Sequence, residues 1–257
     1  MNKLARIVED IDSAFIIQAR LTSTRLPGKI LLPFTHDGRT ILDIIIDKLK
    51  DFHNYRIVVA TSDDKNNDSL VDYLIQKDIL YFRGSENDVL CRFISAAEYF
   101  HIDKIVRICS DNPFIDVASI NTLLQTVQEC PADYISFNVD GTPSIKTHFG
   151  FWAEFVTTDA LKRVSQLTDD ALYHEHVTNY IYTHKNEFDI KWIDVDSSIA
   201  NKSNIRLTID TKNDFALAQE IWEKVGEQHS ISDIISLVKD NEEYLYRMQQ
   251  EINKNTK

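Results

Sequence analysis

Residues 16–29 read Ile16-Ile17-Gln18-Ala19-Arg20-Leu21-Thr22-Ser23-Thr24-Arg25-Leu26-Pro27-Gly28-Lys29. Residues 14–17 form a short apolar run that predicts a buried strand, and Pro27-Gly28 predicts a turn further on. The loop after the strand carries three hydroxyl residues and the cations Arg20, Arg25 and Lys29. Hydroxyls, backbone N–H groups and flexible cations at the end of a strand can bind a triphosphate, so we interpret this loop as an anion site. The alternative is a solvated surface loop.

The order of the residues in this loop is more specific than its charge. Ala19-Arg20 followed by Ser23-Thr24-Arg25-Leu26-Pro27-Gly28-Lys29 resembles the phosphate-binding signature of the sugar nucleotidyltransferases, and more closely that of their cytidylyltransferase branch. That branch includes the spore-coat polysaccharide protein F type and the synthetases that activate keto-deoxy sugar acids. No Walker loop of the form G-x-x-x-x-G-K-[ST] is present. The resemblance implies a three-layer α/β domain with a mainly parallel sheet, a Rossmann-like nucleotide-binding half and a GT-A-like fold.

Composition bounds the class of protein. The 257 residues suit one large α/β domain or one domain with a small appendage, and 43% hydrophobic residues is ample for a core. The net charge of −12 argues against a nucleic-acid partner. The three cysteines show no C-x-x-C spacing, so neither a disulfide framework nor a zinc knuckle is indicated. Neither a membrane-length apolar run nor a signal-peptide core is found, and we therefore expect a cytoplasmic location and no membrane partner.

Strands and helices alternate along the first half of the chain, which predicts a parallel sheet with ligands at the carboxyl ends of its strands. In the second half we expect two further strands, one helix over 172–182, a strand over 204–210, and helices over 215–225 and 231–246. We divide the chain into an N-terminal extension (1–13), a main domain (14–225) with an acceptor-recognition and dimerisation patch at about 138–185, and C-terminal helices (226–257). The expected strands are 14–17, 56–60, 79–82, 104–109, 132–138 and 188–193, and the first helices are 40–49, 68–76 and 88–100.

Two strand ends carry polar residues that suit a nucleotide. Thr61-Ser62 follows the second strand, where the hydroxyls contact the nucleotide or simply form a turn. The stretch from Arg83 to Leu90 resembles the family's Arg-Gly-Ser-Glu-Asp-Asp-Val-Leu loop and departs from it at Asn87. Gly84 lets the backbone approach a base or ribose, and a cap of the following helix is a compatible role for Ser85 and Asp88. The full expected nucleotide set is Gln18, Ala19, Arg20, Ser23, Thr24, Arg25, Gly28, Lys29, Thr61, Ser62, Arg83, Gly84, Ser85, Asp88, Arg107 and Ser110.

A pair of carboxylates is expected to hold the metal. Asp111 follows the strand 104–109, where a carboxylate points into the crevice and suits Mg²⁺, although Asp-Asn-Pro also forms ordinary turns. The segment around Asp210 resembles the family's closing Arg-x-Thr-Val-Asp-Thr-x-x-Asp pattern, which implies that Asp210 meets the same Mg²⁺. Thr211 and Asp214 form an acidic variant of a capping box, so Asp214 has a sufficient structural role. We expect Arg20, Lys29 and Asp111 to be the catalytic residues.

The segment from Asn138 onward is expected to bind the acceptor. By resemblance, Phe149-Gly150-Phe151-Trp152-Ala153-Glu154 closes over a sugar, with Glu154 on its hydroxyls; the aromatic side chains either stack on the sugar or lie in the core. The helix at 172–182 matches a family pattern with His174 in place of arginine, which would make an anion contact pH-sensitive. We reject zinc at His174 and His176, because a structural zinc site needs four ligands. The expected acceptor-binding residues are Asn138, Phe149, Trp152, Glu154, Glu175 and His176.

The expected reaction is therefore attack by an acceptor oxygen on the α-phosphorus of CTP, with pyrophosphate leaving. The expected partners are CTP and a sugar acid or a phosphorylated sugar or polyol, used in surface polysaccharide or glycoconjugate synthesis by a homodimer. One alternative is a glycosyltransferase of the related nucleotide-sugar-binding fold, but the Asp-x-Asp motif that it needs is absent near Asp111. The other alternative is a catalytically silent nucleotide-binding module.

Overall fold

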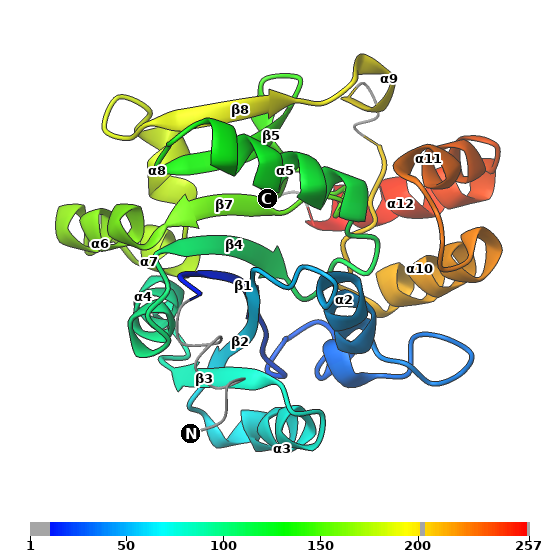
Figure 1. The fold of residues 1–257 in the computed structure, drawn as a ribbon. Coiled ribbons are helices and arrows are strands. Elements are labelled where there is room, and N and C mark those ends of the chain that lie inside the picture. Colours follow the sequence, from blue (N-terminus) through cyan, green and yellow to red (C-terminus); the bar gives the residue numbers. More distant parts are fainter. Residues whose placement is uncertain (1–10, 201–203, 256–257) are drawn as a thin grey trace.

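The computed structural model describes residues 11–200 and 204–255, and an eight-stranded sheet forms its centre (Figure 1). The strand order is β3-β2-β1-β4-β7-β5-β6, and β8 pairs with β5. The parallel sheet expected from the sequence is confirmed in the first half, where the carboxyl ends of β1 and β4 lie side by side. Its four parallel strands are β3 (Leu80–Gly84), β2 (Arg56–Ser62), β1 (Ser13–Gln18) and β4 (Lys104–Cys109).

The second half of the sheet is mixed. Strand β7 (Glu154–Thr157) runs antiparallel to both β4 and β5 (Tyr134–Val139), whereas β8 (Ile190–Asp194) is parallel to β5. The two-residue strand β6 (Thr142–Pro143) forms a hairpin with β5. The sequence reasoning does not predict β7, nor the helices α5 (Val117–Glu129) and α6 (Thr158–Leu167). Insertion of β7 between β4 and β5 brings Glu154 opposite Arg107.

Helices cover both faces of the sheet, as the three-layer prediction requires. Along β1, Phe15 and Ile17 belong to the core under α2, whereas Ala14 and Ile16 belong to the core under α4. A strand buried on both faces needs cover on both sides. Within the described residues, no helix combines the length and the apolar character that a membrane span requires. The remaining helices are η1 (Lys29–Leu31), α2 (Ile41–Leu49), η2 (Lys65–Asn67), α3 (Asp68–Gln76), α4 (Val89–Tyr99), η3 (Ser144–Lys146), α7 (Ala171–Glu175), α8 (Asn179–Thr183), α9 (Ser197–Ala200), α10 (Lys212–Val225), α11 (Ile231–Lys239) and α12 (Glu242–Asn255).

Three of the predicted elements in the second half are wrong. The helix expected over 172–182 is broken, because His176 leaves helical geometry at φ −107° and ψ 74° and separates α7 from α8. The helix expected over 231–246 ends at Lys239, and α12 begins at Glu242. The strand expected over 204–210 is absent from the described sheet: the backbone N–H of Leu207 donates to the carbonyl of His148, and that of Ile209 donates to the carbonyl of Asp111.

The C-terminal helices are part of the core. Tyr244 and Met248 of α12 are buried in the same cluster as Trp222 of α10, so α12 packs on the main domain through one face, while Glu242, Glu243 and Lys254 remain exposed. Lys257, and residues 1–10 of the expected N-terminal extension, lie outside the described residues. The capping box expected at Thr211 and Asp214 is confirmed, and two further capping boxes form at Thr40–Asp43 and Ser230–Asp233.

Candidate active site

A cleft of about 330 Å³ opens at the carboxyl ends of β1 and β4, and we call it the basic cleft. It brings together the residues expected from the loop after β1, from the end of β4, and from the segment before α10. Two residues that the sequence reasoning assigns elsewhere or leaves unassigned, His176 and Cys109, also line it. Burial raises the pKa of the Cys109 thiol to about 11, so this residue is a neutral thiol near pH 7. The lining residues are Gln18, Arg20, Ser23, Thr24, Arg25, Lys29, Arg107, Cys109, Ser110, Asp111, His176 and Asp210.

The loop of the basic cleft has a defined shape because its two ends are tied together. The N–H of Gly28 donates to the carbonyl of Leu21 at 2.9 Å, and Gly28 has φ 69°, a conformation that glycine adopts without strain. Leu26 is buried and anchors the middle of the loop to the core. The N–H of Leu21 also donates to the side-chain oxygen of Asn67 at 2.8 Å. The turn expected at Pro27-Gly28 is therefore confirmed, and it directs Lys29 back toward the cleft.

Lys29 joins the two carboxylates that the sequence predicts as metal ligands. Its Nζ lies 3.2 Å from Oδ2 of Asp111 and 3.5 Å from Oδ1 of Asp210, and it donates to the carbonyl of Ile209. Arg25 lies 2.9 Å from Oδ1 of Asp210. Asp111 and Asp210 come from distant parts of the sequence, and the structure places them on either side of one ammonium group.

This arrangement fits a divalent metal. The Asp111 and Asp210 side chains are 29% and 25% exposed, so their oxygens are open to the cleft, and a cationic group already lies between them. Among the described residues, no group of three or more His, Cys, Asp or Glu side chains could hold a metal ion. Magnesium commonly takes one or two protein carboxylates and completes its shell with water and substrate phosphates. The donor set therefore matches a metal that binds together with a nucleotide.

The loop 83–88 meets the basic cleft through Glu86, which the sequence reasoning does not single out as a site residue. Oε1 of Glu86 lies 3.3 Å from Nη1 of Arg20 and accepts a hydrogen bond from Thr22 at 2.5 Å. The expected capping roles in this loop are confirmed, since Ser85 accepts from the N–H of Asp88, and Asp88 accepts from the N–H of Cys91. Glu86 thus fixes the distance between two loops that both follow strand ends.

Eight of the residues predicted to bind nucleotide do not line the basic cleft: Ala19, Gly28, Thr61, Ser62, Arg83, Gly84, Ser85 and Asp88. Thr61 and Ser62 are fully buried within β2, and the Ser62 hydroxyl accepts the N–H of Asp64 at 2.9 Å, so neither lines the cleft. Arg83 donates to the carbonyls of Ser62, Asp63 and Asp64 and pairs with Asp68 at 2.8 Å. Its charge holds the end of β2 in place and is not directed into the basic cleft.

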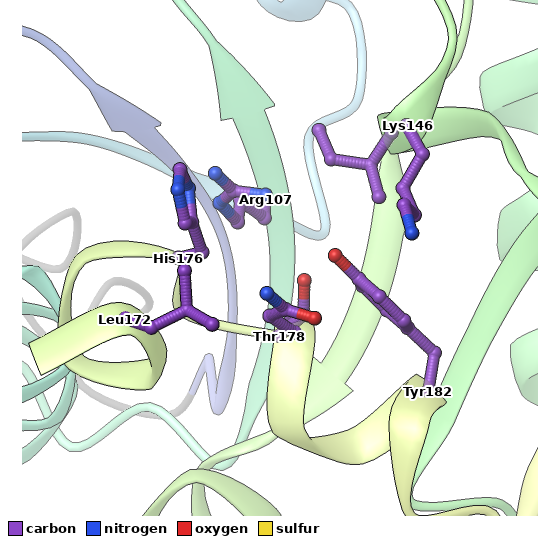
Figure 2. Close-up of a pocket in the computed structure, with 8 residues that line it drawn as sticks. Arg107, Lys146, Leu172, His176, Thr178 and Tyr182 are labelled. Carbon is purple, nitrogen blue, oxygen red and sulfur yellow. The ribbon is translucent and has the colours of Figure 1, made fainter. Parts of the chain in front are cut away.

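A second cavity of about 300 Å³ adjoins the basic cleft, and we call it the side pocket (Figure 2). Arg107 and His176 line both cavities, so the two spaces meet at these side chains. In Figure 2, His176 and Leu172 lie on one side of the pocket with Arg107 beside His176, and Lys146 and Tyr182 lie on the other side. The lining residues are Arg107, Ile145, Lys146, Leu172, His176, Thr178, Asn179 and Tyr182.

The model of the cytidylyltransferase family matches residues 14–252 of the chain. This chain belongs to the cytidylyltransferase family. It is 33% identical over 240 residues to the spore coat polysaccharide biosynthesis protein SpsF of Bacillus subtilis, a match that covers 90% of this chain and 95% of that protein. The family resemblance inferred from the loop after β1 is confirmed.

Two solved structures are similar to this cytidylyltransferase. A cytidylyltransferase from Leptospira borgpetersenii is 26% identical with a TM-score of 0.79, covering 91% of this chain and 97% of that chain. A CMP:2-keto-3-deoxy-manno-octonic acid synthetase complexed with CTP shares the fold at 15% identity and a TM-score of 0.62, covering 83% of this chain and 99% of that one. The chain is thus a nucleotidyltransferase that uses CTP, which sets aside the glycosyltransferase and the silent module.

The structure of this cytidylyltransferase corrects most of the expected acceptor contacts. Phe149 and Trp152 are 2% and 8% exposed and pack against each other with ring centroids 5.4 Å apart, so they form core and do not stack on a sugar. Asn138 donates to Asp194 at 2.7 Å and lines neither cavity, and Glu175 is exposed away from both. His176 lines both cavities. Lys146, Asn179 and Tyr182 also line the side pocket, and no short motif marks them in the sequence.

Glu154 is also buried instead of facing a substrate. It is 2% exposed and accepts hydrogen bonds from Arg107, from the hydroxyl of Tyr134, and from Oγ1 of Thr178 at 2.9 Å. The other terminal nitrogen of Arg107 donates to Oε1 of Gln18 at 3.0 Å. Glu154 therefore acts behind the wall that the basic cleft and the side pocket share, and its expected contact with acceptor hydroxyls is wrong.

Proposed function

We propose that this cytidylyltransferase transfers CMP from CTP to a sugar acid or to a phosphorylated sugar or polyol, and that the product is a precursor of a surface polysaccharide or glycoconjugate. One observation carries the proposal: the basic cleft and the side pocket share two lining residues, Arg107 and His176. A triphosphate in the first cavity and an acceptor in the second would meet there. The name of the Bacillus relative and the shared fold of the CTP-bound synthetase support the chemical class.

The reaction that fits this geometry is an in-line displacement at the α-phosphorus. A bond forms between an acceptor oxygen and the α-phosphorus, the bond from the α-phosphorus to the bridging oxygen of the β-phosphate breaks, and pyrophosphate leaves with that electron pair. An acceptor phosphate attacks as an anion, whereas an acceptor hydroxyl gives up its proton, and the His176 imidazole lies at the junction where this happens. Positioning and electrostatics then supply most of the rate.

The basic loop supplies the charges for the leaving group. Arg20, Arg25 and Lys29 line the basic cleft and would bind the β- and γ-phosphates. Asp111 and Asp210 would hold Mg²⁺, which supplies charge neutralisation at the phosphates when bound. Each of the three cations now pairs with a carboxylate, so the phosphates would replace contacts that the protein makes to itself.

The side pocket suits an anionic acceptor. Its lining contains the amine of Lys146, the amide of Asn179 and the hydroxyl of Tyr182, and no carboxylate side chain is among the described residues that line it. Burial raises the pKa of Tyr182, so its hydroxyl stays protonated and can donate a hydrogen bond near pH 7. Donors without competing acids favour a carboxylate or phosphate group on the ligand.

A pyrophosphate-release screen tests the proposal. Each of ATP, CTP, GTP and UTP is combined with Mg²⁺ and a panel of keto-deoxy sugar acids, sugar phosphates, polyol phosphates and neutral sugars. We expect release with CTP and at least one anionic acceptor, and little release with the other nucleotides. Equal release with all four nucleotides, or turnover confined to neutral sugars, would contradict the proposal.

We also propose a homodimer that uses the segment 138–185. Leu167 and Leu172 in this segment are 52% and 49% exposed, which suits a subunit contact. Light scattering after size exclusion should give twice the chain mass of 29.7 kDa. A mass of one chain at micromolar concentration would contradict this proposal and leave the proposed reaction standing.

A further inference from the structure

The wall between the basic cleft and the side pocket contains a buried network centred on Glu154. Its carboxylate receives three donors from three different elements: Arg107 on β4, Tyr134 on β5, and Thr178 at the start of α8. Arg107 and Glu154 are 8% and 2% exposed. Burial raises the pKa of Tyr134 well above its usual value, so this residue stays a hydroxyl donor.

Stability alone does not account for this pair. Removing two charges from water costs free energy that their attraction only partly returns, and apolar residues of similar volume often do as well. The network is also placed where substrates would meet. Arg107 lines both cavities, Gln18 lines the basic cleft, and Thr178 lines the side pocket. Figure 2 shows Arg107 and Thr178 bordering the same space.

The contacts of Arg107 determine its electrical effect on the site. One terminal nitrogen donates to Glu154 and the other to Gln18, so the guanidinium is held at both ends. Its positive charge is matched by a carboxylate in direct contact. The cations of the loop after β1 pair instead with Glu86, Asp111 and Asp210. The wall at the junction therefore offers hydrogen-bond donors without net charge.

We propose that Glu154 is a positioning residue that keeps Arg107 as a neutral pair at this junction and ties Thr178 of the side pocket to the same carboxylate. This inference rests on the proposed function, because it assumes that a triphosphate occupies the basic cleft. A neutral wall leaves the β- and γ-phosphates to the basic loop, so pyrophosphate is not retained beside the acceptor. An uncompensated Arg107 would attract that product.

Binding of inorganic pyrophosphate, measured by calorimetry at fixed Mg²⁺ without acceptor, tests the sign of this effect. Glu154→Gln leaves Arg107 uncompensated, and we expect pyrophosphate to bind at least about fivefold more tightly than to the wild type. Arg107→Met leaves Glu154 uncompensated and should weaken binding by a similar factor. The double variant R107M/E154Q is neutral again and should return to within about threefold of the wild type. Asp72→Asn, which removes one carboxylate charge on the exposed face of α3 and away from both cavities, is the control and should leave the dissociation constant unchanged.

The outcomes separate the two proposals. A wild type that binds neither CTP nor pyrophosphate contradicts the proposed function. If the wild type binds both CTP and pyrophosphate, and Glu154→Gln binds pyrophosphate equally or more weakly, only the role of Glu154 is overturned. Tighter binding by Glu154→Gln supports that role, because loss of a merely structural contact would not tighten the binding of an anion. If either single variant fails to fold, the double variant R107M/E154Q decides. A pyrophosphate affinity of the double variant about tenfold or more below that of the wild type would show that Arg107 binds phosphate as a cation, and would overturn the inference.

Discussion

The basic cleft and the side pocket are neighbours that carry their charges in different ways. In the basic cleft, Arg25, Lys29 and Asp210 pair with partners whose side chains remain partly open to the cavity. At the side pocket, the charged pair of Arg107 and Glu154 is buried: Arg107 forms part of the lining, and Glu154 lies behind it. Open ion pairs contribute little to stability and can be exchanged for ligand contacts, whereas a buried pair is costly to break. The ion pairs of the basic cleft can therefore rearrange when a ligand binds, whereas the buried ion pair in the wall of the side pocket stays in place.

The same contrast separates the loop after β1 from the aromatic segment 149–152. The loop leads into the cavity, and its shape depends on a local turn at Gly28. The aromatic segment is buried, and its rings pack against one another and against Phe137. Substitutions in the loop should change binding and turnover, whereas substitutions in the segment should change the free energy of unfolding.

The largest expected effect is that of Asp111→Ala. It removes one of two carboxylates that would hold the metal, and we expect turnover to fall about 10⁴-fold, equivalent to about 5.4 kcal/mol in the barrier. The fold should persist, because Asp111 is partly exposed and its partner Lys29 retains its ion pair with Asp210. Pyrophosphate release and circular dichroism measure the two effects. Asp72→Ala on the exposed face of α3 is the matched control, and unchanged turnover in Asp111→Ala would sink the assignment of the cleft.

Phe149→Ala should destabilise the protein by about 3–4 kcal/mol in urea unfolding, because it empties a buried site lined by Phe151 and Trp152. Ile75→Ala, at a side chain that is 58% exposed, should change stability by less than about 0.5 kcal/mol. CTP affinity should stay near the wild-type value in both folded variants. If the Phe149→Ala protein has normal stability but binds the acceptor more weakly, Phe149 contacts the sugar and is not a core residue.

The sequence predicts the basic cleft better than the side pocket for a physical reason. The cleft depends on a continuous loop, Ser23 to Lys29, and on residues that directly follow strands, so short motifs and the rule for parallel sheets locate it. The side pocket depends on β7 lying between β4 and β5, a long-range pairing with no local signature. Glu154 is therefore expected from the sequence to contact acceptor hydroxyls, whereas in the fold it is a buried hydrogen-bond acceptor.

Local patterns also overstate the continuity of helices. The apolar spacing across 172–182 continues through His176, but Thr178 turns inward to donate to Glu154, and the helix breaks there. The break positions His176 and Asn179 at the side pocket. Capping residues are predicted correctly because a cap depends on contacts within four residues, as at Thr211 and Asp214.

A smaller effect is expected for Lys29→Met, which tests whether the charges of the basic cleft are exchangeable. Loss of a charge-assisted contact to phosphate should raise the CTP dissociation constant about 10- to 100-fold in calorimetry. Stability should change by less than about 1 kcal/mol, since the carboxylate partners are partly exposed. Lys65→Met, at an exposed lysine of η2, is the control for charge alone. A CTP affinity within twofold of the wild type would show that Lys29 serves the carboxylates and not the nucleotide.

The smallest effect should come from His174, which ties the two regions together. Its Nδ1 lies 2.8 Å from Oδ2 of Asp88 at the start of α4, and its Nε2 lies 3.0 Å from the carbonyl of Thr168. Burial lowers the pKa of His174, but the Thr168 carbonyl and the Asp88 carboxylate outweigh it, and the pKa is raised. The stabilisation is therefore complete below the unfolded-state pKa of about 6.5 and is lost as the pH rises through the folded-state value.

His174→Gln should accordingly reduce the free energy of unfolding by up to about 1 kcal/mol at pH 5.5 and by less at pH 8.5, because an open pair contributes little even when both groups are charged. Urea unfolding at the two pH values measures the difference, and His53→Gln, at an exposed histidine, gives the baseline. An equal loss at both pH values would mean that His174 joins α7 to α4 through neutral hydrogen bonds. The contact between His174 on α7 and Asp88 at the start of α4 would then be as permanent as the Glu154 network. Exchangeable ion pairs would in that case be confined to the basic cleft.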